Sequence, residues 1–282
     1  MKQVRFGAAL AAALPLGVIQ FGFGIQAAQA QAPTVQAQPL SVAAPAAAPA
    51  PPASPPDMID LARIAQAQIA TVPDVDKRIA DIDAWVLKYP NSTYKGYAFG
   101  MAGQASQMKQ DRKGAIAYYE KALEVDPKDH MSMLMIAAET AQGTTEHDLQ
   151  KDEKLEHADF LLSQAMILIP ISPKLNPAAT DEQWAQVRKD DMAQAYETSG
   201  LIAMVRKKYD DAAKAFQQSI NTASTKQPAT YVRLGNALNE AKKYDEATKA
   251  LDQALAMPGL PDQIKRAAEN EKTRTQQLRT MK

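Results

Sequence analysis

The sequence predicts an all-α fold in which helix pairs stack into a solenoid, and three observations lead to this prediction. The segment Lys207–Phe216 (KKYDDAAKAF) returns thirty-five residues later as Lys242–Leu251 (KKYDEATKAL). In each copy an aromatic residue, an alanine and a bulky apolar residue recur at helical spacing, which places them on one face of a helix. A second related pair of segments precedes the copies, at 195–206 and 230–241. A recurrence at this period indicates stacked helical units rather than one closed core.

The segments before the two copies share an aromatic residue followed four residues later by a glycine. With these positions the chain resembles the tetratricopeptide repeat family, whose pattern of aromatic, Leu, Gly, Tyr, Ala and Pro positions spans about 34 residues. The resemblance implies a right-handed superhelical solenoid of antiparallel helix pairs. The second copy fills the pattern with Tyr231, Leu234, Gly235, Leu238, Tyr244, Ala247, Leu251 and Ala254, and the first with Tyr196, Gly200, Ala203, Tyr209, Ala212 and Phe216.

Residues 1–30 predict a secretory signal peptide. Lys2 and Arg5 precede the apolar stretch Phe6–Ile25, and the small residues up to Ala30 offer a cleavage point after that alanine. The alternative is an uncleaved membrane anchor, although the glycines within the apolar stretch weaken it as a spanning helix. We therefore expect an exported protein in the periplasm or at the cell surface of a bacterium.

Residues 31–56 predict a disordered tether, because they are almost entirely Ala, Pro, Gln, Val and Ser. Such a segment buries too little apolar surface to offset the entropy of ordering it. Its prolines favour extended conformations, so we expect a semi-stiff spacer. The alternative is a Pro-rich docking ligand, but no charged residue stands beside the prolines to anchor one.

Residues 57–282 predict a helical domain that begins with a half-repeat at 57–92. Helices are expected at 57–70 and 76–88, because apolar residues recur there at helical spacing. The sequence Val72-Pro73-Asp74 should separate these two helices. Four repeats are expected after them, at about 96–127, 130–170, 193–224 and 228–258, followed by a capping helix at 261–279.

Three features inside this domain bear on its local structure. Arg112 stands where the tetratricopeptide family usually has Tyr. The segment Gly143–Asp152 exceeds the repeat length, and we place it between the two helices of its repeat, where insertions leave the stacked core undisturbed. Thr180, followed three residues later by Gln183, predicts the N-cap of a long helix.

Composition argues against several classes of function. The chain has 32 Lys plus Arg and 32 Asp plus Glu, so it lacks the basic footprint that nucleic-acid binding requires. Its three histidines have no paired ligand spacing and it has no cysteine, which argues against a metal site. No Gly-rich phosphate loop or nucleophile elbow occurs. We therefore predict no catalytic residues, no cofactor and no enzymatic activity.

The tetratricopeptide resemblance implies a concave groove lined by the first helix of each repeat. Five methionines fall on lining positions, and methionine suits surfaces that accept varied apolar partners. The alternative is that the insertion covers the groove and the methionines pack inside. The family's set of Lys, Asn and Arg residues for binding a C-terminal carboxylate is absent. The predicted partner-binding residues are Tyr97, Met101, Gln104, Met108, Met131, Leu134, Met135, Gln194, Glu197, Leu201, Met204, Arg233 and Asn236.

The sequence thus predicts a protein–protein interaction scaffold of the bacterial cell envelope, which binds a protein or peptide in its concave groove. A small-ligand-binding or catalytic accessory protein of the periplasm is the alternative. We expect no nucleic-acid partner, and membrane contact only through the signal segment if that segment is not cleaved.

Overall fold

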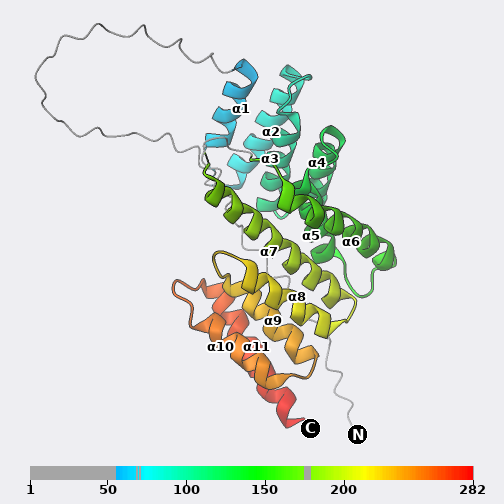
Figure 1. Ribbon diagram of the computed structural model, residues 1–282, viewed down its shortest axis with the longest axis vertical. Helices are drawn as coiled ribbons and strands as arrows, with labels where there is room; N and C mark the ends of the chain where they lie inside the picture. The colour runs from blue at the N-terminus through cyan, green and yellow to red at the C-terminus, as the bar shows by residue number, and fades with distance from the viewer. Residues whose placement is uncertain (1–54, 68, 70, 175–178, 282) are drawn as a thin grey trace, which may run out of the picture.

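Helices account for most of the computed structural model, which describes residues 55–67, 69, 71–174 and 179–281 (Figure 1). No strand occurs in those ranges, and none of their helices is long and apolar enough to cross a membrane. The predicted signal peptide, and all but the last two residues of the predicted tether, lie outside them. The elements are α1 (Pro56–Gln66), α2 (Val72–Lys88), α3 (Lys95–Met108), α4 (Arg112–Val125), α5 (His130–Gly143), α6 (Lys151–Leu168), the 3-10 turn η1 (Ile169–Ile171), α7 (Asp181–Val205), α8 (Tyr209–Thr222), α9 (Pro228–Glu240), α10 (Tyr244–Leu255) and α11 (Asp262–Thr280).

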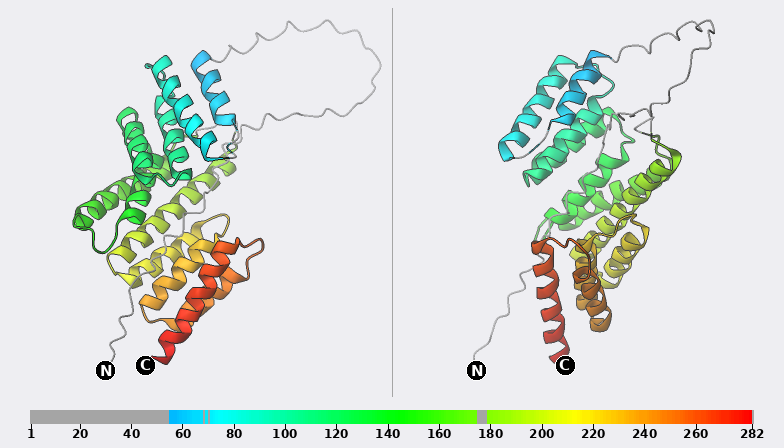
Figure 2. Two further views of the ribbon diagram at one scale, coloured as in Figure 1. Left: turned by 180° about the vertical axis from the view of Figure 1, so that it is seen from behind. Right: turned by 90° about the vertical axis from the view of Figure 1, so that its left-hand side faces the viewer.

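Consecutive helices pack as pairs, and the pairs stack along the long axis of the molecule (Figures 1 and 2). The tightest packing is within α3–α4, α5–α6, α7–α8 and α9–α10. The second helix of each pair also contacts the first helix of the next pair. The last helix, α11, packs on both α9 and α10 and closes that end of the stack. The predicted all-α solenoid of helix pairs is therefore confirmed.

Glycines allow the two helices of a pair to approach closely. A side-chain Cβ built at three of them would lie well inside the contact distance of a buried ring or leucine on the paired helix. These glycines stand at equivalent positions of three repeats, so the same close approach recurs along the stack. The contacts are Gly103 with Tyr119 (2.7 Å), Gly200 with Phe216 (2.6 Å) and Gly235 with Leu251 (2.7 Å).

One predicted helix start was wrong and another was correct. The prediction that α2 begins at Asp76 was wrong, because the helix begins at Val72 and holds Pro73 in its first turn. Proline is tolerated there, since the first backbone N–H groups of a helix have no intrahelical acceptor. The prediction for Thr180 was correct: its hydroxyl accepts from the Gln183 N–H at 3.2 Å, and the Gln183 side chain accepts from the Thr180 N–H at 2.9 Å.

The turn inside three helix pairs contains a residue in the left-handed conformation. Gln110, Lys207 and Lys242 have φ angles of 60°, 60° and 62°, and each stands two residues after the end of a first helix. The next residue then donates its backbone N–H back into that helix, as Lys243 does to the Leu238 carbonyl at 2.8 Å. A residue with a Cβ pays roughly 1–2 kcal/mol for this conformation, which glycine adopts freely.

Replacing Lys242 with glycine should therefore raise the free energy of unfolding by about 1 kcal/mol. The measurement is a urea unfolding curve followed by circular dichroism. Lys208→Gly is the control, because Lys208 lies in a similar turn but has a φ of −86°, so glycine relieves no left-handed strain there. An unchanged or lower midpoint for Lys242→Gly would contradict the role given to the left-handed turn.

The stacking changes at α7. This 25-residue helix packs directly on α5. It packs less closely on α6 than the first helix of each other pair packs on the second helix before it. Two hydrogen bonds from α7 hold the segment that directly follows α6: Trp184 donates its indole N–H to the Ser172 carbonyl at 3.0 Å, and Arg188 donates to the Pro170 carbonyl at 3.1 Å. One side of α6 consequently remains uncovered.

Candidate functional site

The thirteen predicted groove residues all lie on the first helices α3, α5, α7 and α9, but they differ in accessibility. Two are exposed, five are half-buried and six are buried. The exposed residues are Tyr97 and Met108, and the half-buried ones are Gln104, Met131, Leu201, Met204 and Asn236. The buried ones are Met101, Leu134, Met135, Gln194, Glu197 and Arg233.

Polar side chains join α3 to α5. The Gln107 amide donates to Glu139 at 2.8 Å, and the other carboxylate oxygen of Glu139 accepts from Arg112 Nε at 3.0 Å. Tyr119 of α4 donates its hydroxyl to Gln107 at 2.8 Å. Burial, with the nearby Glu139 carboxylate as a smaller cause, raises the pKa of Tyr119, so its hydroxyl remains a donor. Arg112, which replaces the usual tyrosine, therefore supplies a cation to a nearly buried carboxylate.

The contacts between α5 and α7 are also polar. Gln194 donates its amide to the Met135 sulfur at 3.7 Å, and the His130 ring lies 3.4 Å from the Asp191 carboxylate. Burial raises the pKa of Asp191, and the hydrogen bond with His130 opposes that rise. These two contacts therefore link the first helices of two successive pairs.

An ion pair joins α7 to α9. Glu197 accepts from Arg233, and also from the Thr230 hydroxyl at 3.1 Å. The Glu197 and Arg233 side chains are only 7% and 9% exposed. A buried ion pair contributes little to net stability but is costly to break, because one charge is then left in an apolar surrounding.

The last link in the series joins α9 to α11. Asn236 and Asn239 both donate to the Glu271 carboxylate, at 3.2 and 2.8 Å, and Asn239 also donates to Thr275 at 2.9 Å. Arg274 donates to the same carboxylate at 2.7 Å. We call the links from α3 to α11 the inter-repeat polar contacts. They include five predicted groove residues: Met135, Gln194, Glu197, Arg233 and Asn236.

The methionines separate into two groups. Met101 packs in a core with Leu61 and Trp85, and Met135 packs in the core between α5 and its neighbours. Met108 is exposed, whereas Met131 and Met204 are half-buried. The accessible part of α3 runs along one helical face through Tyr97, Gln104 and Met108. Contact of any of these residues with a partner stays a prediction.

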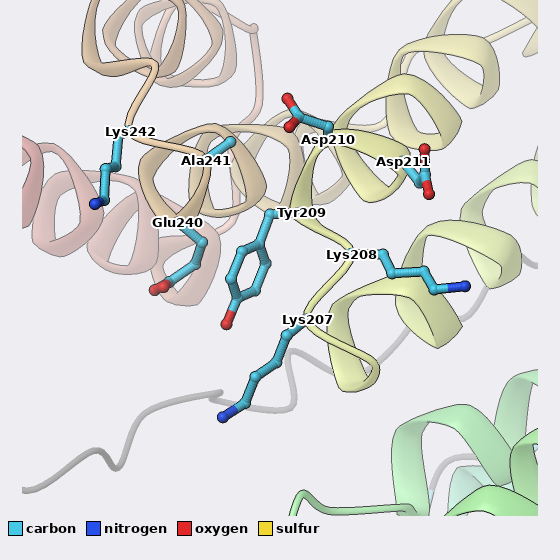
Figure 3. Close-up of a pocket in the computed structure, with 8 residues that line it drawn as sticks. All are labelled: Lys207, Lys208, Tyr209, Asp210, Asp211, Glu240, Ala241 and Lys242. Atoms are coloured by element: carbon cyan, nitrogen blue, oxygen red, sulfur yellow. The ribbon is translucent and has the colours of Figure 1, made fainter.

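Two open depressions lie away from this face, at the turns inside the last two helix pairs. The first is lined by Lys207, Lys208, Tyr209, Asp210, Asp211, Glu240, Ala241 and Lys242, with the Tyr209 ring between Glu240 and Lys207 (Figure 3). Three lysines and three carboxylates balance there. Lys207 bonds Glu146 of the inserted segment, which raises the pKa of the lysine. The side chains that line the depression therefore carry no net formal charge.

A sequence model described as the tetratricopeptide repeat matches residues 97–129 and 228–258. Two segments of the chain therefore match the tetratricopeptide repeat. These two repeats cover α3–α4 and α9–α10, which include the contacts of Gly103 with Tyr119 and Gly235 with Leu251. The pair α7–α8 lies outside the matched residues, but its contact of Gly200 with Phe216 repeats the geometry of the matched repeats.

Solved structures similar to this chain include the assembly chaperone of RpL4 (Acl4), at 13% identity and a TM-score of 0.41. That match covers 80% of this chain and 98% of the chaperone. The Cut9–Hcn1 hetero-tetramer of the APC/C matches at 16% identity and a TM-score of 0.39. That match covers 72% of this chain and 40% of the matched chain. No curated protein matches the chain significantly.

Proposed function

We propose that this chain is a protein–protein interaction scaffold of the bacterial cell envelope, and that it binds a protein or peptide along its first helices. The observation that supports this proposal is the presence of two tetratricopeptide repeats within a stack of helix pairs. Such stacks offer extended surfaces that suit binding of protein segments.

Of the thirteen predicted groove residues, we assign partner binding to the accessible ones. The inter-repeat polar contacts already engage Gln194, Glu197 and Arg233 within the fold. On α3, in contrast, Tyr97 and Met108 are 43% and 39% exposed, and a Cβ built at Gly100 between them would meet nothing within 4 Å. Apolar side chains beside open space can bury area against an amphipathic helix or an extended apolar segment.

The test is affinity capture from envelope extract with tagged wild-type protein and with the double variant Tyr97→Ser, Met108→Gln. Loss of both side chains should reduce partner recovery at least tenfold, because each buries apolar area in the complex. Leu87→Gln is the matched control, since Leu87 is an apolar residue that is 83% exposed but lies on α2, which carries none of the predicted groove residues. Equal recovery by the double variant and wild type would overturn the α3 site.

The same preparation tests export. The bait recovered from the envelope fraction should have a mass that corresponds to a chain starting at Gln31, after cleavage of the apolar N-terminal segment. A bait with Met1 intact in the cytoplasmic fraction would contradict the envelope location.

A further inference from the structure

Three buried oxygen atoms follow one another along α7, where this helix packs on α5. They are Oδ1 of Asp191, Oε1 of Gln194 and Oγ1 of Thr198, and none of them has a hydrogen-bond partner within the part of the chain that the structure describes. Their residues are only 1%, 5% and 0% exposed. Buried polar atoms in native proteins are almost always hydrogen-bonded, so three in succession indicate that a further group binds there. We call these three atoms the α7 oxygen row.

The α7 oxygen row lies on the side of α7 that faces α5. Asp191 and Gln194 already contact α5 through their other polar atoms, which meet His130 and Met135. Thr198 follows Gln194 by four residues, a step that returns to nearly the same side of a helix. Ile202, four residues further on, packs in the core that α5 and α6 share. The row is therefore enclosed between the two helices.

The repeat register shows that Thr198 is unusually short for its place. The residue two positions before the glycine of the close helix contact is Met101 in α3, Thr198 in α7 and Arg233 in α9. Thr198 nevertheless has no exposed surface. At this place α7 lacks the long side chain that the other two helices have, which leaves room for a small polar molecule beside the threonine hydroxyl.

The Asp191 carboxylate also requires more partners than the protein supplies. Its described partner is the His130 ring nitrogen, which lies 3.4 Å from Oδ2. A carboxylate can accept about four hydrogen bonds, and its burial is costly unless most of them form. A donor of hydrogen bonds at Oδ1 is therefore expected.

We propose that two ordered water molecules bind between α5 and α7 and bridge the α7 oxygen row. The first water donates to Asp191 Oδ1 and to Gln194 Oε1. The second donates to Gln194 Oε1 and accepts the hydrogen of the Thr198 hydroxyl. An amide oxygen has two lone pairs, so it can accept from both waters. Each water then has two protein partners, within the usual range for buried water.

The spacing along α7 suits water and not a metal ion. Residues three and four apart are separated along the helix axis by about 4.5 and 6 Å. A water that bonds two oxygens at about 2.8 Å each can span up to about 5.6 Å, and the flexible Gln194 side chain can cover the remainder. One metal ion would instead need all three oxygens within roughly 2.6 Å of it, whereas Asp191 and Thr198 are about 10 Å apart along the axis.

The first experiment is a crystal structure of the wild-type protein at a resolution that shows ordered water. Two density peaks are expected at about 2.7–3.2 Å from the atoms of the α7 oxygen row. Thr198→Val keeps the shape of the side chain and removes its hydroxyl, so in that variant the second peak should disappear and the first should remain. Fewer than two peaks in the wild type, or protein donors in contact with the three oxygens, would overturn the proposal.

The second experiment counts the waters in solution by oxygen-17 magnetic relaxation dispersion, which detects water held inside a protein for longer than its rotational tumbling. Thr198→Val should lower the count by one. Thr144→Val is the matched control, because the buried Thr144 hydroxyl already donates to the Thr140 carbonyl at 2.7 Å. That variant should keep the wild-type count. Equal counts in wild type and Thr198→Val, or an equal loss in both variants, would contradict the bridging waters.

The stability of Thr198→Val gives a third, independent result. If the hydroxyl holds a water, its removal should lower the urea midpoint, because the water and Gln194 Oε1 each lose a hydrogen bond. If the hydroxyl instead lies in a dry interface without a partner, valine should raise the midpoint, since an unsatisfied polar group is replaced by a methyl group of the same shape. A raised midpoint would therefore overturn the proposal.

Discussion

Replacement of Arg233 by methionine should lower the free energy of unfolding by about 3–5 kcal/mol. The substitution leaves the Glu197 carboxylate buried between α7 and α9, with only the Thr230 hydroxyl, at 3.1 Å, among its former partners there. A carboxylate in such a site loses most of its solvation by water, and too few hydrogen bonds replace it. The loss should appear as a lower urea midpoint by circular dichroism.

The control is the double variant Glu197→Leu, Arg233→Met, which removes both charges and fills the space with apolar groups. Buried ion pairs replaced in this way often lose little stability. The double variant should therefore recover most of the loss of Arg233→Met. If it is as unstable as the single variant, the cost comes from lost packing and not from a buried charge.

Gly235→Leu should lower the free energy of unfolding by about 3 kcal/mol, at the upper end of the usual cost of overpacking. Even the first carbon of the new side chain would lie 2.7 Å from Leu251, which is fully buried and has little room to move. The paired helices α9 and α10 would have to separate. Thermal unfolding followed by circular dichroism measures the effect.

Gly100→Leu is the matched control for this overpacking. Gly100 also lies inside a first helix, but a Cβ there meets nothing within 4 Å. Leucine favours the helix over glycine by roughly 0.5–1 kcal/mol, so this variant should be slightly more stable. Two glycine variants with equal midpoints would show that the close helix contact at Gly235 does not limit stability.

The glycine contacts could be predicted because the repeat encodes them locally. The aromatic residue, the glycine and the later bulky residue stand at fixed offsets within one repeat, so their register in the sequence also fixes their register in space. The same reasoning identified the capping box at Thr180. It misplaced the start of α2, because Pro73 was read as a helix breaker although proline fits the first turn of a helix.

The accessibility of the candidate site could not be predicted in the same way. Register placed Glu197 and Arg233 on first helices, but their pairing joins residues thirty-six positions apart on two different repeats. Sequence reasoning likewise missed Glu139 and Glu271, because a single acidic residue on a helix is usually solvated. A search for opposite charges or amides one repeat period apart would have identified them as candidates.

The inter-repeat polar contacts also bear on how such a chain can change length during evolution or in engineering. Excision of one period, residues 208–242, would preserve the helix pattern and place Leu201 and Met204 where Asn236 and Asn239 now stand. Glu271 would then face a leucine and a methionine instead of the two amides that donate to it at 3.2 and 2.8 Å. The polar side chains between two neighbouring repeats therefore match only each other. Gain or loss of a repeat requires compensating substitutions on the adjoining helices.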